Sequence, residues 1–150
     1  DFVDISEVTQ GTIPARLINH FYYRWQVLPC RTTGDLITAL YRVLPKLNTY
    51  DVIIATTDAI ALGLAYFKRS RRLRAEIIYL SMGLASALNR IKRCSKTQFS
   101  KFKAMCGLEI SQFQKIWTAG KAEKEFFCSE YDQFKTKFVY SSDPVSSFCK

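Results

Sequence analysis

Apolar residues in the first third of the chain recur mostly at helical spacing. Residues 2–5 alternate weakly between apolar and polar and predict a short strand. From Ala15 to Val27, apolar and aromatic residues lie three and four positions apart, which predicts a helix. A second helix is predicted to begin after Thr33 and to bury a stripe that ends at Leu47. Pro45 lies inside that stripe, so we expect a kink or an early end there.

The segment from Asp51 to Gly83 has the clearest pattern. A short β-branched run, Val52–Ala55, is followed by helical spacing over Ala59–Phe67 and then by a second apolar run, Ile77–Leu80. Strand, helix and strand at this spacing predict a right-handed crossover between two parallel strands. Short strands that are apolar throughout also favour cover on both faces of the sheet.

The alternation continues to the end of the chain. After a basic connection, a helix is predicted over Phe99–Phe113, a strand over Ile116–Ala119, a short helix over Ala122–Phe127 and a strand over Lys137–Tyr140. The order predicts an α/β fold: a Rossmann-like, doubly wound parallel sheet with helices on both faces. Ligands of such a sheet bind beyond the carboxyl ends of its strands.

Composition fits one domain with a basic surface. The 150 residues are 48% hydrophobic and carry a net charge of +9, which favours anionic partners. No run of eighteen apolar residues predicts a membrane span. Five cysteines without metal-ligand spacing, and the lack of a signal-peptide pattern, predict a reduced, cytoplasmic protein without a metal site. The single histidine, His20, is interpreted as a surface or packing residue.

Nearly all the excess charge lies between Lys68 and Lys103, where eleven basic residues face one acid, Glu76. The first part, up to Arg74, follows a predicted helix and complements its dipole. The second part is interleaved with aromatic residues and is expected near the ligand edge. Three readings stay open for it: a solvated face, a surface for an anionic membrane, or a nucleic-acid surface. Its basic residues are Arg90, Lys92, Arg93, Lys96, Lys101 and Lys103.

Three turns follow predicted strands, so a parallel sheet would bring them to one edge. A threonine or aspartate in the first turn is read either as a helix cap or as a group that recognises ligand hydroxyls. Glycines in the other two allow close approach of a ligand, but neither has the spacing of a nucleotide-binding fingerprint. The candidate substrate-binding residues are Thr56, Thr57, Asp58, Ser81, Met82, Gly83, Gly120, Lys121 and Glu123.

The order of these motifs resembles the N-terminal lobe of family 4 glycosyltransferases, which have two Rossmann-like lobes. The resemblance starts at Tyr50 and covers most of the chain from there. It is carried by the run YDVIIATTDAIALGLAYFKRSRRLRAEIIYLSMGLA, a basic helix after it, KIWTAGKAEKEFF and KFVYSSDPVSSFCK. Met82 stands where many relatives have histidine, and Gly120 where they have serine.

The resemblance implies an acceptor-side lobe, spanning residues 1–150, of a retaining enzyme that moves a sugar from a nucleotide-sugar donor to a lipid-linked or saccharide acceptor. It implies no covalently bound cofactor. It also implies that the first strand of the lobe precedes Asp1 and that the donor is held mainly by a second lobe after Lys150, so that the 150 residues alone are inactive. Peripheral attachment to the cytosolic face of a membrane would use the basic segment. The alternative is a noncatalytic basic α/β module that binds nucleic acid or acts as an interaction scaffold.

Overall fold

The computed structural model describes residues 34–140, and these form an α/β fold around a four-stranded parallel sheet. The predicted strand at residues 2–5, the predicted helix over Ala15–Val27 and His20 lie outside the described residues. Helix α2 (Gly34–Leu47) continues two residues beyond Pro45, so the expected early end is wrong. It leads into strand β1 (Val52–Ala55).

The predicted crossover unit is present. Helix α3 (Asp58–Arg69) connects β1 to strand β2 (Glu76–Ser81), and the two strands are parallel, with Ile53 opposite Ile77. The next connection is a pair of helices, α4 (Leu84–Cys94) and α5 (Lys96–Ile110), which pack against each other. The residue pattern predicted only a basic connection before Phe99, and this is wrong for α4. The family resemblance implied a basic helix after Ala85, and a helix is present there.

The last third follows the predicted order with shifted boundaries. Strand β3 (Lys115–Thr118) is followed by helix α6 (Lys121–Glu130), a 3-10 helix η2 (Asp132–Lys137) and strand β4 (Phe138–Tyr140). The four strands lie in the order β1-β2-β3-β4, all parallel.

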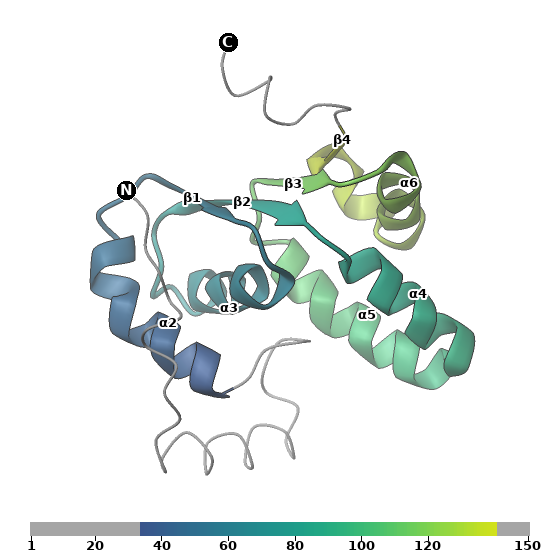
Figure 1. Cartoon of the computed structure of the whole chain (residues 1–150), viewed down its shortest axis with the longest axis horizontal. Coiled ribbons are helices and arrows are strands. Elements are labelled where there is room, and N and C mark those ends of the chain that lie inside the picture. The colour runs from purple at the N-terminus through teal and green to yellow at the C-terminus, as the bar shows by residue number, and fades with distance from the viewer. Residues whose placement is uncertain (1–33, 141–150) are drawn as a thin grey trace.

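The strands form one layer and the helices lie against one of its faces, as Figure 1 shows with α3 and α5 beneath the strands. Burial alternates accordingly: Ile77 and Tyr79 are fully buried, whereas Val52 and Ile54 on the opposite face are about half exposed. Because the strand order does not reverse, right-handed crossovers place every connecting helix on the same face. We expected helices on both faces of the sheet, but within residues 34–140 they cover only one face.

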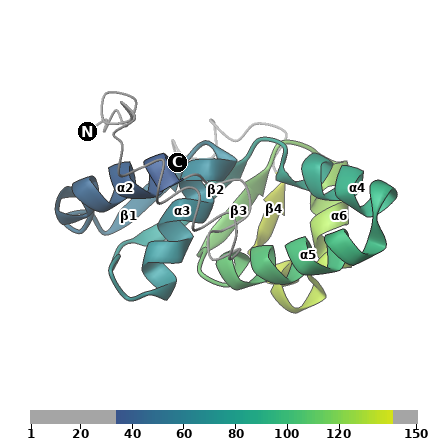
Figure 2. The same cartoon turned by 90° about the horizontal axis from the view of Figure 1, so that it is seen from below.

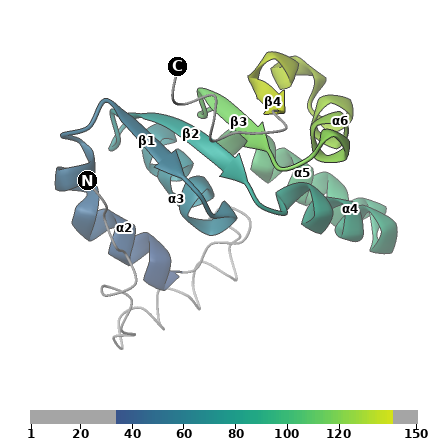
Figure 3. The ribbon, with the colours of Figure 1, turned by 45° about the horizontal axis from the view of Figure 1, so that its top comes forward.

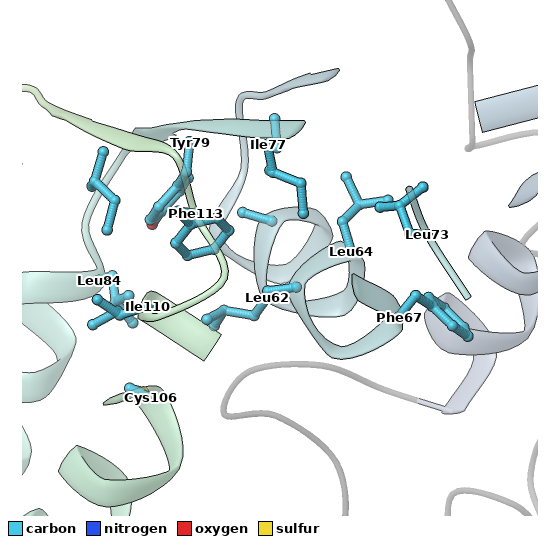
Figure 4. Close-up of a cluster of buried hydrophobic side chains, with 14 of the residues drawn as sticks. Leu62, Leu64, Phe67, Leu73, Ile77, Tyr79, Leu84, Cys106, Ile110 and Phe113 are labelled. Carbon is cyan, nitrogen blue, oxygen red and sulfur yellow. The ribbon is translucent and has the colours of Figure 1, made fainter. Parts of the chain in front are cut away.

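The core fills the space between this covered face and the helices. Leu64 of α3 points towards Ile77 of β2, whereas Phe67 points towards α2, where Tyr41 lies 6.3 Å from its ring centre (Figure 4). Leu62 points towards Ile110 and Phe113, which close the core from the side of α5. Burying a side chain of this size contributes about 1.5–3 kcal/mol, so these contacts fix the helices on the sheet. Near β4, the rings of Phe127 and Phe138 stack with centroids 5.1 Å apart, which fixes α6.

The elements spread along the long axis of the molecule. Helix α2 and the edge strand β1 lie at one end, and the α4–α5 pair extends at the other, as the view from below makes clear (Figure 2). The carboxyl ends of the strands point towards α4, and their amino ends point towards the loop that joins α3 to β2 (Figure 3). The molecule therefore presents two different sheet edges to solvent.

Candidate functional site

The three predicted turns do meet at one edge of the sheet. Parallel register places Ala55, Tyr79 and Ile116 in one row across the strands, so the residues that follow β1, β2 and β3 emerge side by side. Hydrogen bonds between side chains then join the turns. We call the edge formed by residues 56–58, 81–83 and 119–123 the turn cluster.

Asp58 connects the first turn to the second. Thr57 caps α3 by accepting a hydrogen bond from the backbone N–H of Ile60 at 3.4 Å, so the helix-cap reading of this turn holds for Thr57. The carboxylate of Asp58, in the first turn of α3, accepts hydrogen bonds from the Tyr79 hydroxyl and from the backbone N–H of Met82. Asp58 is 9% exposed, so its carboxylate is a buried link in the turn cluster, and Thr56 beside it is exposed.

Glu123 connects the second turn to the third. Its Oε1 accepts a hydrogen bond from the Ser81 hydroxyl at 2.7 Å, and its Oε2 accepts one from the backbone N–H of Ala119 at 3.0 Å. The second bond satisfies an N–H next to the start of α6, where a glutamate in the first turn also complements the helix dipole. Ser81 is 1% exposed, so this link closes the floor of the cluster.

Two glycines open the surface of the cluster. Gly83 precedes α4 with φ of 142°, a backbone conformation that side chains disfavour, and Gly120 precedes α6 in an extended conformation. A Cβ atom on either would meet no atom within 4 Å. The side chains of Met82 and Lys121 are largely exposed beside them. The outer surface of the cluster therefore combines open backbone with exposed side chains, and the buried hydrogen bonds of Asp58 and Ser81 lie beneath them.

Tyr79 belongs to the cluster although the sequence did not single it out. Its side chain is fully buried on the helix-covered face of β2, where its ring lies 5.2 Å from that of Phe113. Burial, together with the neighbouring Asp58 carboxylate, raises the pKa of the Tyr79 hydroxyl far above its usual value, so the phenol stays a proton donor. A tyrosine within the apolar run Ile77–Leu80 was the signal in the sequence.

The basic segment is arranged differently from the expectation. Arg90 and Arg93 lie in the second half of α4 and Lys96 begins α5, so these residues lie towards the far end of the helix pair rather than at the sheet edge. Lys92 and Lys103 bind opposite oxygens of Glu130, at 2.5 and 3.0 Å.

Both lysines therefore fasten α6 to the helix pair, and together with the single carboxylate of Glu130 they leave a net charge of +1. Phe99 is 8% exposed and belongs to the core, with the Lys92 ammonium 5.5 Å from its ring centre. Among the described residues, no ion pair neutralises the remaining cations of the segment. These are Arg90, Arg93, Lys96 and Lys101.

The described residues form neither a metal site nor a membrane span. Within residues 34–140, no three histidine, cysteine, aspartate or glutamate side chains converge as metal ligands would. No helix in this part of the chain has the length and apolar character needed to span a bilayer.

Comparison of the chain with protein-family models, curated proteins and solved structures found no significant match. The resemblance to family 4 glycosyltransferases rests on the order of motifs from Tyr50 onwards.

Proposed function

We propose that this chain is the acceptor-side part of a retaining glycosyltransferase, which moves a sugar from a nucleotide-sugar donor to a lipid-linked or saccharide acceptor. One observation carries the proposal: Asp58, Ser81 and Glu123 join three strand-to-helix turns into one cluster at the carboxyl edge of a parallel sheet. Such edges are where Rossmann-like lobes bind their ligands.

The chemistry of the cluster suits an acceptor rich in hydroxyl groups. Open backbone at Gly83 and Gly120 allows close approach, and carboxylate oxygens accept hydrogen bonds from sugar hydroxyls. The thioether of Met82 and the backbone of Gly120 do not transfer protons at neutral pH. The cluster would therefore hold and orient the acceptor, while contacts to the donor phosphates belong to the second lobe that the family resemblance implies.

The four unpaired cations of the α4–α5 pair would keep the enzyme on the membrane that carries a lipid-linked acceptor. Each cation near an anionic membrane contributes about 1 kcal/mol, so four of them give reversible, salt-dependent attachment. A sedimentation assay with vesicles containing phosphatidylserine measures it. Retention at low salt that is lost when Arg90, Arg93 and Lys96 are changed to alanine supports the membrane part, and retention that does not change removes it.

Acceptor binding is tested on the 150-residue chain itself. Titration with short saccharides and a soluble lipid-diphosphate saccharide should shift the NMR amide signals of Met82, Gly83 and Gly120. Glu123→Gln should weaken this binding, whereas Glu125→Gln, an exposed glutamate in the same helix, should not. If these amide signals do not shift with any saccharide, the turn cluster does not bind the acceptor and this part of the proposal is wrong. Sugar transfer is tested separately, with a panel of nucleotide sugars and the longest natural chain that contains these residues.

A noncatalytic scaffold is the second candidate, because the polar side chains of the cluster already bond to one another. Asp58 and Glu123 each accept two hydrogen bonds from the protein, as expected of residues that stabilise a fold. A scaffold predicts that Glu123→Gln lowers stability and leaves saccharide titrations flat, and that the longest chain releases no nucleotide from any donor.

A further inference from the structure

The loop between α3 and β2 carries a second, separate concentration of positive charge. Ser70–Ala75, which we call the arginine loop, holds three arginines within four positions, and all three are exposed. It lies at the amino edge of the sheet, opposite the turn cluster (Figure 1). The carboxyl end of α5 is beside it, because Glu109 pairs with Arg69, but the tip where α4 meets α5 is at the far end of the molecule. A partner bound here would therefore touch neither the proposed acceptor site nor the proposed membrane surface.

The loop is built as a fixed structure. Asn48, just after α2, donates from its amide to the carbonyl of Arg72 at 3.0 Å and accepts from the N–H of Arg74 at 2.8 Å. The ammonium of Lys68 donates to the carbonyl of Ala75 at 2.9 Å, and Leu73 is buried beneath the loop. These bonds hold the arginine side chains outwards on a backbone that is already ordered, which lowers the entropy cost of binding.

The loop starts with the end of helix α3. Arg71 has φ of 60° and is the only non-glycine residue with positive φ in the described part of the chain. Its N–H donates to the carbonyl of Lys68, and the N–H of Arg72 donates to the carbonyl of Phe67, both at 2.9 Å, as in a Schellman helix end. These bonds fix the backbone that carries the first two arginines of the loop.

An exposed aromatic ring completes the surface. Tyr41 of α2 is 56% exposed, and the guanidinium of Arg72 lies 5.7 Å from its ring centre. Within residues 34–140, no acidic side chain pairs with Arg71, Arg72 or Arg74. The nearby acids Glu76 and Glu109 are bound by Lys68 at 3.0 Å and by Arg69 at 3.1 Å. This leaves Asp51 beside the three arginines.

We propose that the arginine loop and Tyr41 form a binding surface for single-stranded nucleic acid. Planar guanidinium groups bind backbone phosphates through paired hydrogen bonds, and an exposed tyrosine offers a face on which a base stacks. A lipid bilayer fits less well, because Leu73, the one large aliphatic residue of the arginine loop, is buried and cannot insert. The inference is independent of the glycosyltransferase proposal.

The test measures binding of a fluorescein-labelled 12-nucleotide RNA to the 150-residue chain by anisotropy, between 50 and 200 mM salt. The wild-type chain should bind, with affinity that falls steeply as salt rises. Changing Arg71, Arg72 and Arg74 to alanine should weaken binding at low salt by about tenfold or more and reduce the salt slope by about 2, because each phosphate contact on a single strand contributes about 0.7 to that slope.

A second triple variant removes the same charge elsewhere. Arg90, Arg93 and Lys96 changed to alanine lie on the α4–α5 pair and should affect RNA binding less than the loop variant. An equal or larger effect of this second variant would overturn the proposal, because binding would then follow net charge or the other surface. Absence of wild-type binding at 50 mM salt would overturn it as well. So would a loop variant that binds RNA normally but loses retention on phosphatidylserine vesicles.

Two single substitutions separate stacking from charge without removing any arginine. Tyr41→Ala should weaken RNA binding several-fold and leave the salt slope unchanged, while Tyr41→Phe should bind as the wild type does. Asn48→Ala frees the loop backbone at constant charge and should also weaken binding with the slope unchanged. If both alanine variants bind RNA as tightly as the wild type, neither the Tyr41 ring nor the fixed backbone of the arginine loop contributes to binding, and the proposal fails.

Discussion

The carboxylate of Glu109, in the last turn of α5, lies 3.1 Å from the guanidinium of Arg69, in the last turn of α3. The pair joins two helices that pack side by side under the sheet. Glu109 is 2% exposed and its second oxygen, Oε2, has no hydrogen-bond partner. Burial outweighs the attraction of Arg69 and raises the pKa of Glu109 to about 7.

This raised pKa predicts a stability that falls as pH rises. Between pH 4.5 and 7 the folded chain keeps a proton on Glu109 that the unfolded chain has lost, so folding is favoured most at the acidic end of that range. The group's contribution is lost progressively as pH rises from 4.5 to 7, with a total change of about 3 kcal/mol, because one pKa unit corresponds to about 1.4 kcal/mol. Urea unfolding of the wild type and of Glu109→Gln at pH 5, 6, 7 and 8 measures it.

The difference between these two proteins isolates the group, because every other titrating residue, His20 included, is present in both. The difference should change steadily between pH 5 and 7 and level off towards pH 8, with Glu109→Gln gaining relative stability as pH rises. Glu125→Gln removes an exposed carboxylate and serves as the control. Curves for the wild type and Glu109→Gln that stay parallel over this range would contradict the prediction.

Glu130 predicts the opposite dependence on pH. Hydrogen bonds from Lys92, and from Lys103 on the other oxygen, lower the pKa of its carboxyl group below the usual range. Its contribution to stability is therefore present above pH 4.5 and is lost as pH falls through the lowered pKa. Glu130→Gln should cost about 1–2 kcal/mol at pH 7, since both lysines are partly exposed to solvent, and little at pH 3.

Hydrogen exchange checks where this loss occurs. Because Glu130 fastens α6 to the helix pair, amides of α4 and α6 should exchange faster in Glu130→Gln, while those of β1 and β2 should keep their protection. Asp132→Asn, which removes an exposed acid two residues further on, is the matched control. Uniform loss of protection throughout the described elements would contradict a local role.

The buried bond between Tyr79 and Asp58 predicts a coupled pair. Tyr79→Phe removes the hydroxyl donor and leaves the Asp58 carboxylate with the Met82 N–H, at a cost of about 1–3 kcal/mol. Asp58→Asn should cost a similar amount, and the double variant should cost less than the two together. Urea unfolding of the four proteins at pH 7 gives this coupling. Additive losses would show that the bond contributes nothing to stability.

Much of the fold could be predicted because several elements have strong local patterns. The runs Val52–Ala55 and Ile77–Leu80 are short, apolar and bounded by polar residues, and both are strands in the structure. Helix α4 was implied by the family resemblance but missed in the residue pattern, because its charged residues masked a regular spacing. Leu84, Leu88 and Ile91 are four and three residues apart, and the two leucines are buried. Reading spacing before charge would have found it.

The sequence predicts at which edge of the sheet the residues of the candidate site lie, but not which of them form hydrogen bonds with one another. Parallel strands bring their carboxyl ends to one edge, so the positions of Thr57, Ser81 and Glu123 followed from the order of elements. The bond between Ser81 and Glu123 joins residues 42 positions apart, and nothing local in the sequence specifies such a pairing. The one-sided sheet was missed for a related reason, since local patterns predict strands but not their order in the sheet.

Two glycines of the turn cluster provide the last prediction, because only one of them needs to be glycine. Gly83 has φ of 142°, so alanine there is strained even though its Cβ would meet no neighbour. Gly83→Ala should therefore cost about 1–3 kcal/mol. Gly120 has an extended backbone with the same open space, so Gly120→Ala should leave stability within about 0.5 kcal/mol of the wild type.

The comparison between the two variants also separates stability from binding. If the open backbone beside α6 serves a ligand, Gly120→Ala should keep the wild-type unfolding midpoint in urea and still weaken saccharide binding, because the added methyl group occupies the approach to the cluster. Equal losses of stability in Gly83→Ala and Gly120→Ala would show that backbone conformation does not distinguish the two positions. A Gly120→Ala variant that binds saccharide as the wild type does would place the ligand away from this turn.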